Sequence, residues 1–163
     1  MADTLFYVID SSSLIDMKRY YPMGTFKTLW ARCHALINER RLGAPATVFE
    51  ELARWDDELH QWAKKHKKLF HDESAFIQQQ NEIMSSFSGL VDPNKTNNDA
   101  DPWIIAMARE KSISTLLDVC VVTEESKRQS PGKKRIRIPE VCDYYSICCC
   151  SMVEMFQKEG WVF

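Results

Sequence analysis

The stretch LFYVIDSSSL, residues 5–14, decides the fold, because a short apolar strand ends there in an acid followed by three serines. Continuous apolar strands are typical of a parallel sheet that is buried on both faces. Serines are favoured at helix starts, so we expect a helix to follow this strand directly. An acid at the end of a buried central strand costs stability unless something pairs with it. Asp10 is therefore the first candidate for a functional residue.

Strand and helix patterns alternate along the rest of the chain. Further strand-forming runs are LGAP, LLDVCVVT, IRIP and ICCC, with helical patterns between them. This alternation predicts an α/β fold, a three-layer α/β/α sandwich with a central, mainly parallel five-stranded sheet. The stretch 56–90 has no proline and its first glycine is Gly89, so it predicts two helices. We expect them to form a hairpin inserted into one domain that spans 1–163.

Two helix starts carry recognisable capping residues. Thr47 follows Pro45 and is expected to cap the helix after the second strand. Asp101 is expected to cap a helix that has Pro102 at its first position. Both residues then have a structural role that needs no further explanation.

Composition and charge are those of an ordinary globular chain. Hydrophobic residues make up 45% of the 163 residues, charged residues 27%, and the net charge is −2. This charge argues against nucleic-acid binding by bulk charge, although local basic patches could still bind it. No apolar run approaches the roughly 20 residues of a membrane span, and the N-terminal residues lack the features of a secretion signal. We expect a cytoplasmic protein with no membrane partner.

The six cysteines lack the paired spacing of a zinc site. Cys148, Cys149 and Cys150 are consecutive, and consecutive strand residues point to opposite faces. We therefore expect reduced thiols that pack as small hydrophobic residues.

Acids fall where the reactive crevice of an open parallel sheet lies, beyond the carboxyl ends of the strands. Asp10 ends the first strand, Glu51 lies just inside the helix after the second, Asp101 opens a helix, and Glu124 and Glu125 follow VVT. Converging carboxylates repel one another unless a divalent cation neutralises them, and oxygen ligands suit Mg²⁺ or Mn²⁺. Acids without a glycine-rich phosphate loop or a nucleophilic His or Cys predict metal-activated water attacking a phosphodiester.

For Asp10 we favour a functional role. Taken singly, the other acids are more simply explained as a helix cap, as acids favoured by a helix dipole or as a solvated turn. Two hydroxyl residues can be cap or turn residues, or donors that orient carboxylates: Ser12 and Thr123.

The order of four motifs, VIDSSSL, TVFEEL, DADPWIIAMA and VCVVTEE, resembles the PIN-domain ribonucleases, especially VapC-type toxins. This resemblance implies that Asp10, Glu51, Asp101 and Glu125 are catalytic and hold Mg²⁺ or Mn²⁺. Glu124 or Asp99 could take the place of Glu125, and Ser12 matches the hydroxyl residue of that family. The ending IRIPEVCDYYSICCCSMVEMFQKEGWVF looks closer still to a PIN-like group catalogued as a domain of unknown function, so the resemblance covers nearly the whole chain.

The resemblance implies a divalent-metal-dependent endoribonuclease that acts as the toxin of a type II toxin–antitoxin pair. RNA would be its substrate, a cognate antitoxin its protein partner, and a homodimer is one assembly to test. Basic residues could meet the RNA backbone or form a solvated face: Lys64, Lys65, Lys67, Lys68, Lys133, Lys134, Arg135 and Arg137. The alternative is a catalytically weak or inactive PIN-like module that holds a protein partner, and metal binding discriminates between the two. A phosphatase of the haloacid-dehalogenase type is disfavoured, because Ser12 stands where it needs a second Asp.

Overall fold

The computed structural model describes residues 4–55, 57–90, 100–125 and 136–163, and within them five strands form one parallel sheet. The strand order is β3-β2-β1-β4-β5, and every neighbouring pair is parallel. The strands are β1 (Leu5–Ile9), β2 (Leu42–Pro45), β3 (Phe70–His71), β4 (Asp118–Val122) and β5 (Cys148–Cys150). The predicted α/β class is confirmed, with a sheet that is parallel throughout.

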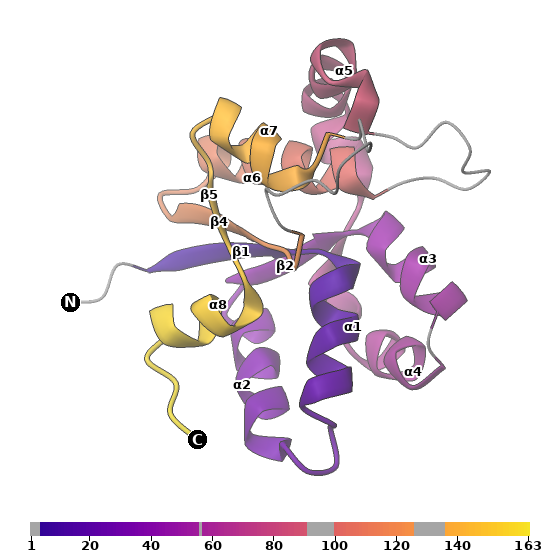
Figure 1. Cartoon of the computed structure of the whole chain (residues 1–163), viewed down its shortest axis with the longest axis vertical. Coiled ribbons are helices and arrows are strands. Elements are labelled where there is room, and N and C mark those ends of the chain that lie inside the picture. The colour runs from indigo at the N-terminus through magenta and orange to yellow at the C-terminus, as the bar shows by residue number, and fades with distance from the viewer. Residues whose placement is uncertain (1–3, 56, 91–99, 126–135) are drawn as a thin grey trace, which may run out of the picture.

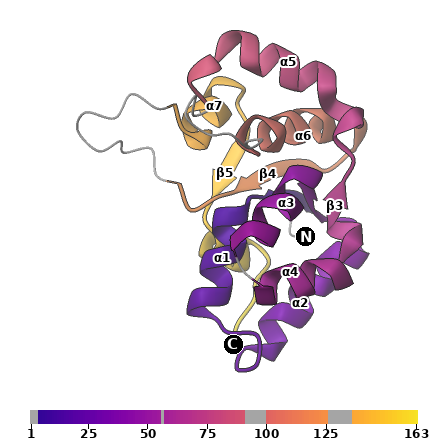
Figure 2. The same ribbon diagram turned by 90° about the vertical axis from the view of Figure 1, so that its right-hand side faces the viewer.

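Helices cover both faces of this sheet, so the molecule is a three-layer α/β/α sandwich (Figures 1 and 2). One face is covered by α1 (Ser11–Tyr20), α2 (Lys27–Asn38), α3 (Ala46–Trp55), α4 (Asp57–Lys65) and α8 (Met152–Lys158). The other face is covered by α5 (Ile77–Ser86), α6 (Asp101–Ser114) and α7 (Ile138–Tyr144).

The core lies where β1 and β4 pair at the centre of the sheet. Their register joins Leu5 to Asp118 and Ile9 to Val122, so both strands end at the same edge. The residues of β1 after Leu5 are buried, as an apolar strand between two helical layers requires. Helix α6 packs across β1, β2 and β4 and is buried continuously from Ile104 to Ala108.

Gly43 on β2 allows this packing to be close. A Cβ at this position would lie 2.8 Å from Met107 Cε, 3.0 Å from His71 Nε2 and 3.1 Å from Phe6 Cζ. Side chains from α6, β3 and β1 therefore occupy the space that any larger residue at Gly43 would need.

One predicted strand is wrong. The run IRIP, residues 136–139, is not extended as a strand: Arg137 precedes α7, and Pro139 lies in the first turn of that helix, where a missing N–H is no loss. The fifth strand is β3, which has two residues and lies at the edge of the sheet.

The segment 56–90 also differs from the expected hairpin. Its described part does contain helices α4 and α5, but β3 lies between them and joins the sheet. Helix α4 packs against α3, and α5 packs against α6. The two helices therefore lie on opposite faces of the sheet, as Figure 2 shows, and the segment is part of the sandwich.

Neither expected capping residue is an N-cap. Helix α3 begins at Ala46, and Thr47 in its first turn donates through its amide to Glu73 Oε1 at 2.6 Å and through its hydroxyl to the same oxygen. Asp101 is itself the first residue of α6, preceded by Ala100. The Glu73 carboxylate, from a distant segment, thus accepts hydrogen bonds from the first turn of α3, where the helix dipole favours an anion.

Four of the cysteines are buried free thiols, as expected: Cys33, Cys120, Cys142 and Cys150. Cys148 is exposed and does not fit that expectation. Across the described ranges, no helix has both the length and the apolar character needed to cross a bilayer.

Candidate acidic site at the carboxyl edge of the sheet

Asp10 is buried, with 4% of its surface exposed, at the point where β1 ends and α1 begins. Its Oδ1 accepts hydrogen bonds from the Ser13 amide at 2.9 Å and from Ser12 Oγ at 2.8 Å. Its Oδ2 accepts one from Thr123 Oγ1, just beyond the end of β4, at 2.5 Å. The amides at a helix start lack partners within the helix, so this junction favours an anion. Donors from two elements fix the orientation of the carboxylate.

Burial raises the pKa of the Asp10 carboxyl to about 6, while the hydrogen bonds from Thr123, the Ser13 amide and Ser12 act to lower it. No Lys or Arg in the part of the chain that the structure describes forms an ion pair with Asp10. A cation beside this group would favour its charged form. A buried carboxylate with hydrogen-bond donors but without a paired cation is a candidate functional group.

Glu51, on α3, links the chain segments that carry the other two acids. Its Oε2 accepts a hydrogen bond from the hydroxyl of Ser11, the neighbour of Asp10. Its Oε1 accepts one from the amide of Ala100, the neighbour of Asp101, at 3.0 Å. The structure therefore brings Asp10, Glu51 and the start of α6 together at one edge of the sheet.

Glu124 and Glu125 follow β4, but their carboxylates bind helix starts. Glu124 Oε1 accepts a hydrogen bond of 2.8 Å from the amide of Met152, the first residue of α8. Glu125 Oε2 accepts one of 3.0 Å from the amide of Ile138, the first residue of α7. Both acids therefore satisfy otherwise unpaired amides and do not form a merely solvated turn. Asp99, the other alternative for the fourth acid, lies outside the described residues.

The oxygen donors at this edge fit a hard divalent cation in their chemistry, since carboxylates are the ligands that Mg²⁺ and Mn²⁺ prefer. Their present arrangement does not form a finished site. Within the described residues, no group of three or more His, Cys, Asp or Glu side chains is placed to hold a metal ion. Asp10 and Glu51 instead accept hydrogen bonds from hydroxyls.

A sequence profile described as a domain of unknown function, DUF4411, matches residues 7–163. The chain belongs to the DUF4411 family. No curated protein and no solved structure matches it. The family description states no activity, so the likeness to PIN-domain ribonucleases stays a prediction for this DUF4411 chain.

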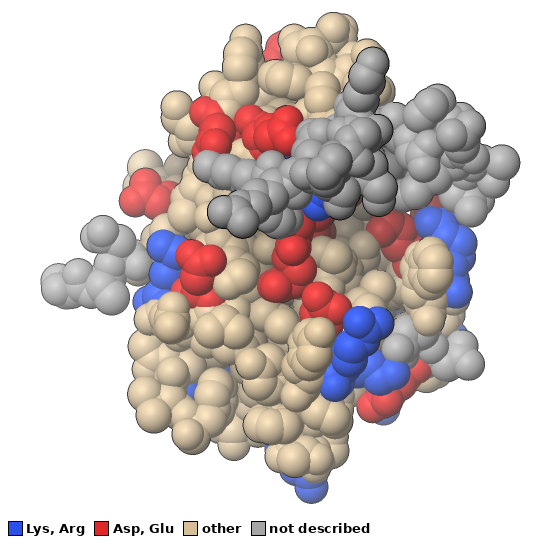
Figure 3. Space-filling view, viewed as in Figure 1, with Lys and Arg blue, Asp and Glu red and all other residues tan. Residues whose placement is uncertain are grey.

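Several acidic side chains of this DUF4411 chain lie on the face of the molecule drawn in Figure 3. Figure 3 shows acids near the centre of that face, over the region where β1 and β4 end and α1 begins in Figure 1. A cavity of about 260 Å³ lies beside Thr123 and is lined by three acids, Glu124, Glu125 and Glu154. The negative charge at this edge thus extends from Asp10 towards α8.

The four described lysines that were expected to meet RNA do not surround these acids. Lys64, Lys65, Lys67 and Lys68 precede β3, so they lie towards the amino edge of the parallel sheet, opposite the acids. Arg137 precedes α7. The remaining three lie outside the described residues: Lys133, Lys134 and Arg135.

Two residues at or near the site were not predicted from the sequence. Ser11 orients Glu51, and Glu73 binds the first turn of the helix that carries Glu51. The serine run did indicate a helix start, but successive helical residues point in different directions. Which serine faces Glu51 depends on the position of α3. Nothing in the local sequence around Glu73 indicates its contact with Thr47.

Proposed function

We propose that this chain is a divalent-metal-dependent endoribonuclease with a PIN-like active site. Glu51 provides the main support, because it hydrogen-bonds the residue after Asp10 and the residue before Asp101. Three acids that are far apart in the sequence therefore belong to one edge of the sheet. The same three acids are those to which the PIN-domain motifs correspond.

Asp10, Glu51 and Asp101 would hold Mg²⁺ or Mn²⁺ in this proposal. When bound, the metal would supply Lewis-acid assistance to the attack of water on a phosphodiester and offset charge on the leaving oxygen.

The protein's own contribution is to orient the carboxylates. Ser12 and Thr123 fix Asp10, and Ser11 fixes Glu51. With a pKa of about 6, Asp10 is mostly ionised at neutral pH even before a cation binds.

The resemblance to VapC-type toxins further supports a role as the toxin of a type II toxin–antitoxin pair. A cognate antitoxin would place a basic side chain over the acids and offset their charge much as a metal does. We expect expression of the chain alone to slow growth and the partner to restore it. Asp101→Asn should be harmless at equal abundance. An equally toxic Asp101→Asn protein would show that the harm does not come from metal-dependent cleavage.

A non-catalytic binding module is the second candidate, and one observation favours it. Both described alternatives for the fourth acid, Glu124 and Glu125, are already bonded to helix starts. A site that lacked a fourth acid could keep the fold and the acidic edge while binding metal weakly. In that case the acidic edge would serve to hold a basic segment of a partner protein.

Cleavage of RNA by the purified protein tests the nuclease proposal. The parent protein should cleave RNA in the presence of Mn²⁺ or Mg²⁺, and cleavage should stop when a chelator is added. Asp10→Asn should slow cleavage by about 100-fold or more, because the metal supplies several kcal/mol of stabilisation in the transition state. The matched control is Asp118→Asn, an exposed acid at the other end of β4, which should retain activity. Cleavage that persists in chelator or in Asp10→Asn would rule out this site, and weak metal binding without cleavage would favour the binding module.

A further inference from the structure

A separate cavity of about 550 Å³ lies at the amino edge of the sheet, opposite the acids. It is lined by residues at the starts of β1 and β2, at the C-terminal ends of α2 and α6, and around β3. In a parallel sheet these positions face away from the carboxyl edge. The cavity is therefore independent of the proposed nuclease site.

Three cations and no acid line this cavity. The cations are Arg40, Lys68 and Lys111, and none of them forms an ion pair with any residue that the structure describes. Asp72 and Glu110 line an adjoining cavity, which shares Lys68, His71 and Lys111 with this one. Like charges around one cavity repel one another until an anion enters.

Arg40 occupies a backbone conformation that disfavours any side chain. Its φ of 58° is in the left-handed region, where glycine is the usual residue after a helix. Two hydrogen bonds close the turn at the end of α2: the Arg40 amide donates to Ile37 O at 3.1 Å and the Arg41 amide donates to Leu36 O at 2.9 Å. A non-glycine residue at such a position is uncommon, and the Arg40 side chain there lines the cavity.

Lys111 and His71 complete the polar lining. Lys111 Nζ lies 5.6 Å from the centre of the Phe6 ring, and His71 packs edge-on against the same ring at 6.5 Å. Burial and the nearby Lys111 lower the pKa of His71. The imidazole is therefore neutral at neutral pH and can accept or donate one hydrogen bond to a ligand.

We propose that this cavity binds a small organic phosphate. Arginine and lysine are the side chains that recognise phosphate oxygens, and three of them line this cavity, whose lining contains no acid. The volume falls within the range of about 300–1,000 Å³ that is typical of small-molecule sites. This size fits a phosphate attached to an organic group.

The helix dipole explains only part of this arrangement. It favours a cation such as Lys111 near the C-terminus of α6. It does not explain an arginine at a strained position beyond α2, nor the gathering of three cations around one cavity.

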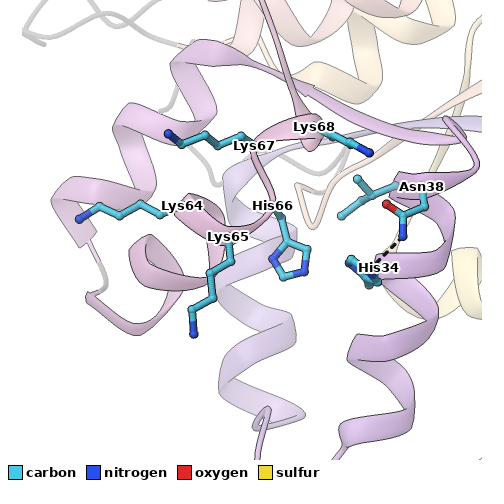
Figure 4. Close-up of a pocket in the computed structure, with 8 residues that line it drawn as sticks. His34, Asn38, Lys64, Lys65, His66, Lys67 and Lys68 are labelled. Atoms are coloured by element: carbon cyan, nitrogen blue, oxygen red, sulfur yellow. Dashed lines mark hydrogen bonds between the residues drawn. The ribbon is translucent and has the colours of Figure 1, made fainter.

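A neighbouring basic cavity of about 360 Å³, between α2 and α4, offers a matched control (Figure 4). The rings of His34 and His66 meet edge to face there, with their centroids 4.9 Å apart, while Lys64 and Lys67 extend away from them. Lys64 lines this neighbouring cavity and not the one proposed as a phosphate site. Its removal lowers the charge of the same edge without changing the proposed site.

Calorimetric titration of the full chain with AMP, glucose 6-phosphate and 3-phosphoglycerate tests the proposal. At least one should bind, and its counterpart without phosphate should bind about tenfold more weakly or not at all. Lys111→Gln and Arg40→Gly should each weaken binding about tenfold, and Lys64→Gln less than about twofold. Because Arg40→Gly relieves the left-handed strain, its unfolding midpoint should not fall, and a loss of binding could not be attributed to misfolding.

Three results of these titrations would overturn the proposal. They are no binding of any of the three phosphates, equal binding of the counterparts without phosphate, and an equal loss of affinity in Lys64→Gln. RNA that bound at this edge when the small phosphates did not would also overturn it. None of these outcomes depends on whether the acidic edge cleaves RNA.

Discussion

The hydroxyl of Thr123 donates a 2.5 Å hydrogen bond to Oδ2 of Asp10 and so joins the ends of β4 and β1. The Asp10 amide donates to Val122 O at 3.1 Å, which extends the pairing of the two strands beyond their last residues. The carboxylate is therefore positioned by the sheet itself. A functional group supported by paired strands is held more rigidly than one on a loop.

Replacing Thr123 with Val should lower the free energy of unfolding by about 1–3 kcal/mol, because buried Asp10 loses a hydrogen bond and no other group replaces it. Urea unfolding at mildly alkaline pH, where Asp10 is charged, measures this. Thr28→Val, at an exposed position on α2, should change stability by less than about 0.5 kcal/mol. Equal stability of the two variants would show that the Thr123 hydroxyl does not support Asp10.

The pKa of Asp10 predicts how stability depends on pH. Because burial raises this pKa from 3.8 to about 6, the folded protein binds more protons than the unfolded chain between those values. Protonated Asp10 therefore stabilises the folded protein fully below pH 3.8, and this stabilisation is lost as the pH rises through about 6. The free energy of unfolding falls by about 3 kcal/mol at most.

The comparison of parent and Asp10→Asn across this pH range isolates the effect from that of other carboxylates. The parent should lose stability relative to the variant as the pH rises from about 4 to about 6. Saturating Mn²⁺ should move this loss to lower pH, because a cation favours the charged carboxylate. A constant difference between the two proteins would show that Asp10 has an ordinary pKa.

The fourth acid can be assigned by comparing Glu125→Gln with Glu124→Gln. Glutamine keeps an oxygen that can accept from the helix amide, so each change should cost less than about 1 kcal/mol in stability. We expect Glu125→Gln to weaken Mn²⁺ binding about tenfold, because Glu125 would orient the metal's ligands or its bound water. Glu124→Gln should leave Mn²⁺ binding unchanged. Calorimetric titration with Mn²⁺ measures both, and the opposite result would assign the role to Glu124.

Sequence patterns predicted the strands that are continuous apolar runs and the helix that has a proline at its start. β1 and β4 are continuous apolar runs buried between helices, and α6 has its proline in the first turn. β3 could not be predicted, because Phe70 and His71 form a strand of two residues within a polar segment. IRIP had the alternation of a strand, but its proline suits a helix start equally well.

The positions of the acids could be predicted better than their contacts. Asp10 was identified because a charge at the end of an apolar strand is costly, and it is the buried acid of the site. The bonds of Glu124 and Glu125 to α8 and α7 depend on where those helices begin in space. Local sequence does not contain that information, and the same is true of the contact between Glu73 and Thr47.

Gly43→Ala should destabilise the protein by about 1–3 kcal/mol, because the new methyl group would lie 3.0 Å from His71 Nε2 and 3.1 Å from Phe6 Cζ, two packed rings that cannot move aside as the end of Met107 can. Urea unfolding measures the change. Gly24→Ala is the matched control, since nothing lies within 4 Å of a Cβ at that position. If both variants had the same stability, the close packing of α6 and β3 on β2 would be wrong.

The most direct test of the acidic site is an anomalous difference map from crystals soaked in Mn²⁺. The proposal predicts a peak bound by oxygens of Asp10, Glu51 and Asp101 at roughly 2 Å, and no such peak in crystals of Asp10→Asn. Asp118→Asn, which changes an acid at the amino end of β4, should keep the peak. A map without a peak at these three acids, or with a peak that persists in Asp10→Asn, would contradict the metal site and with it the proposed nuclease activity.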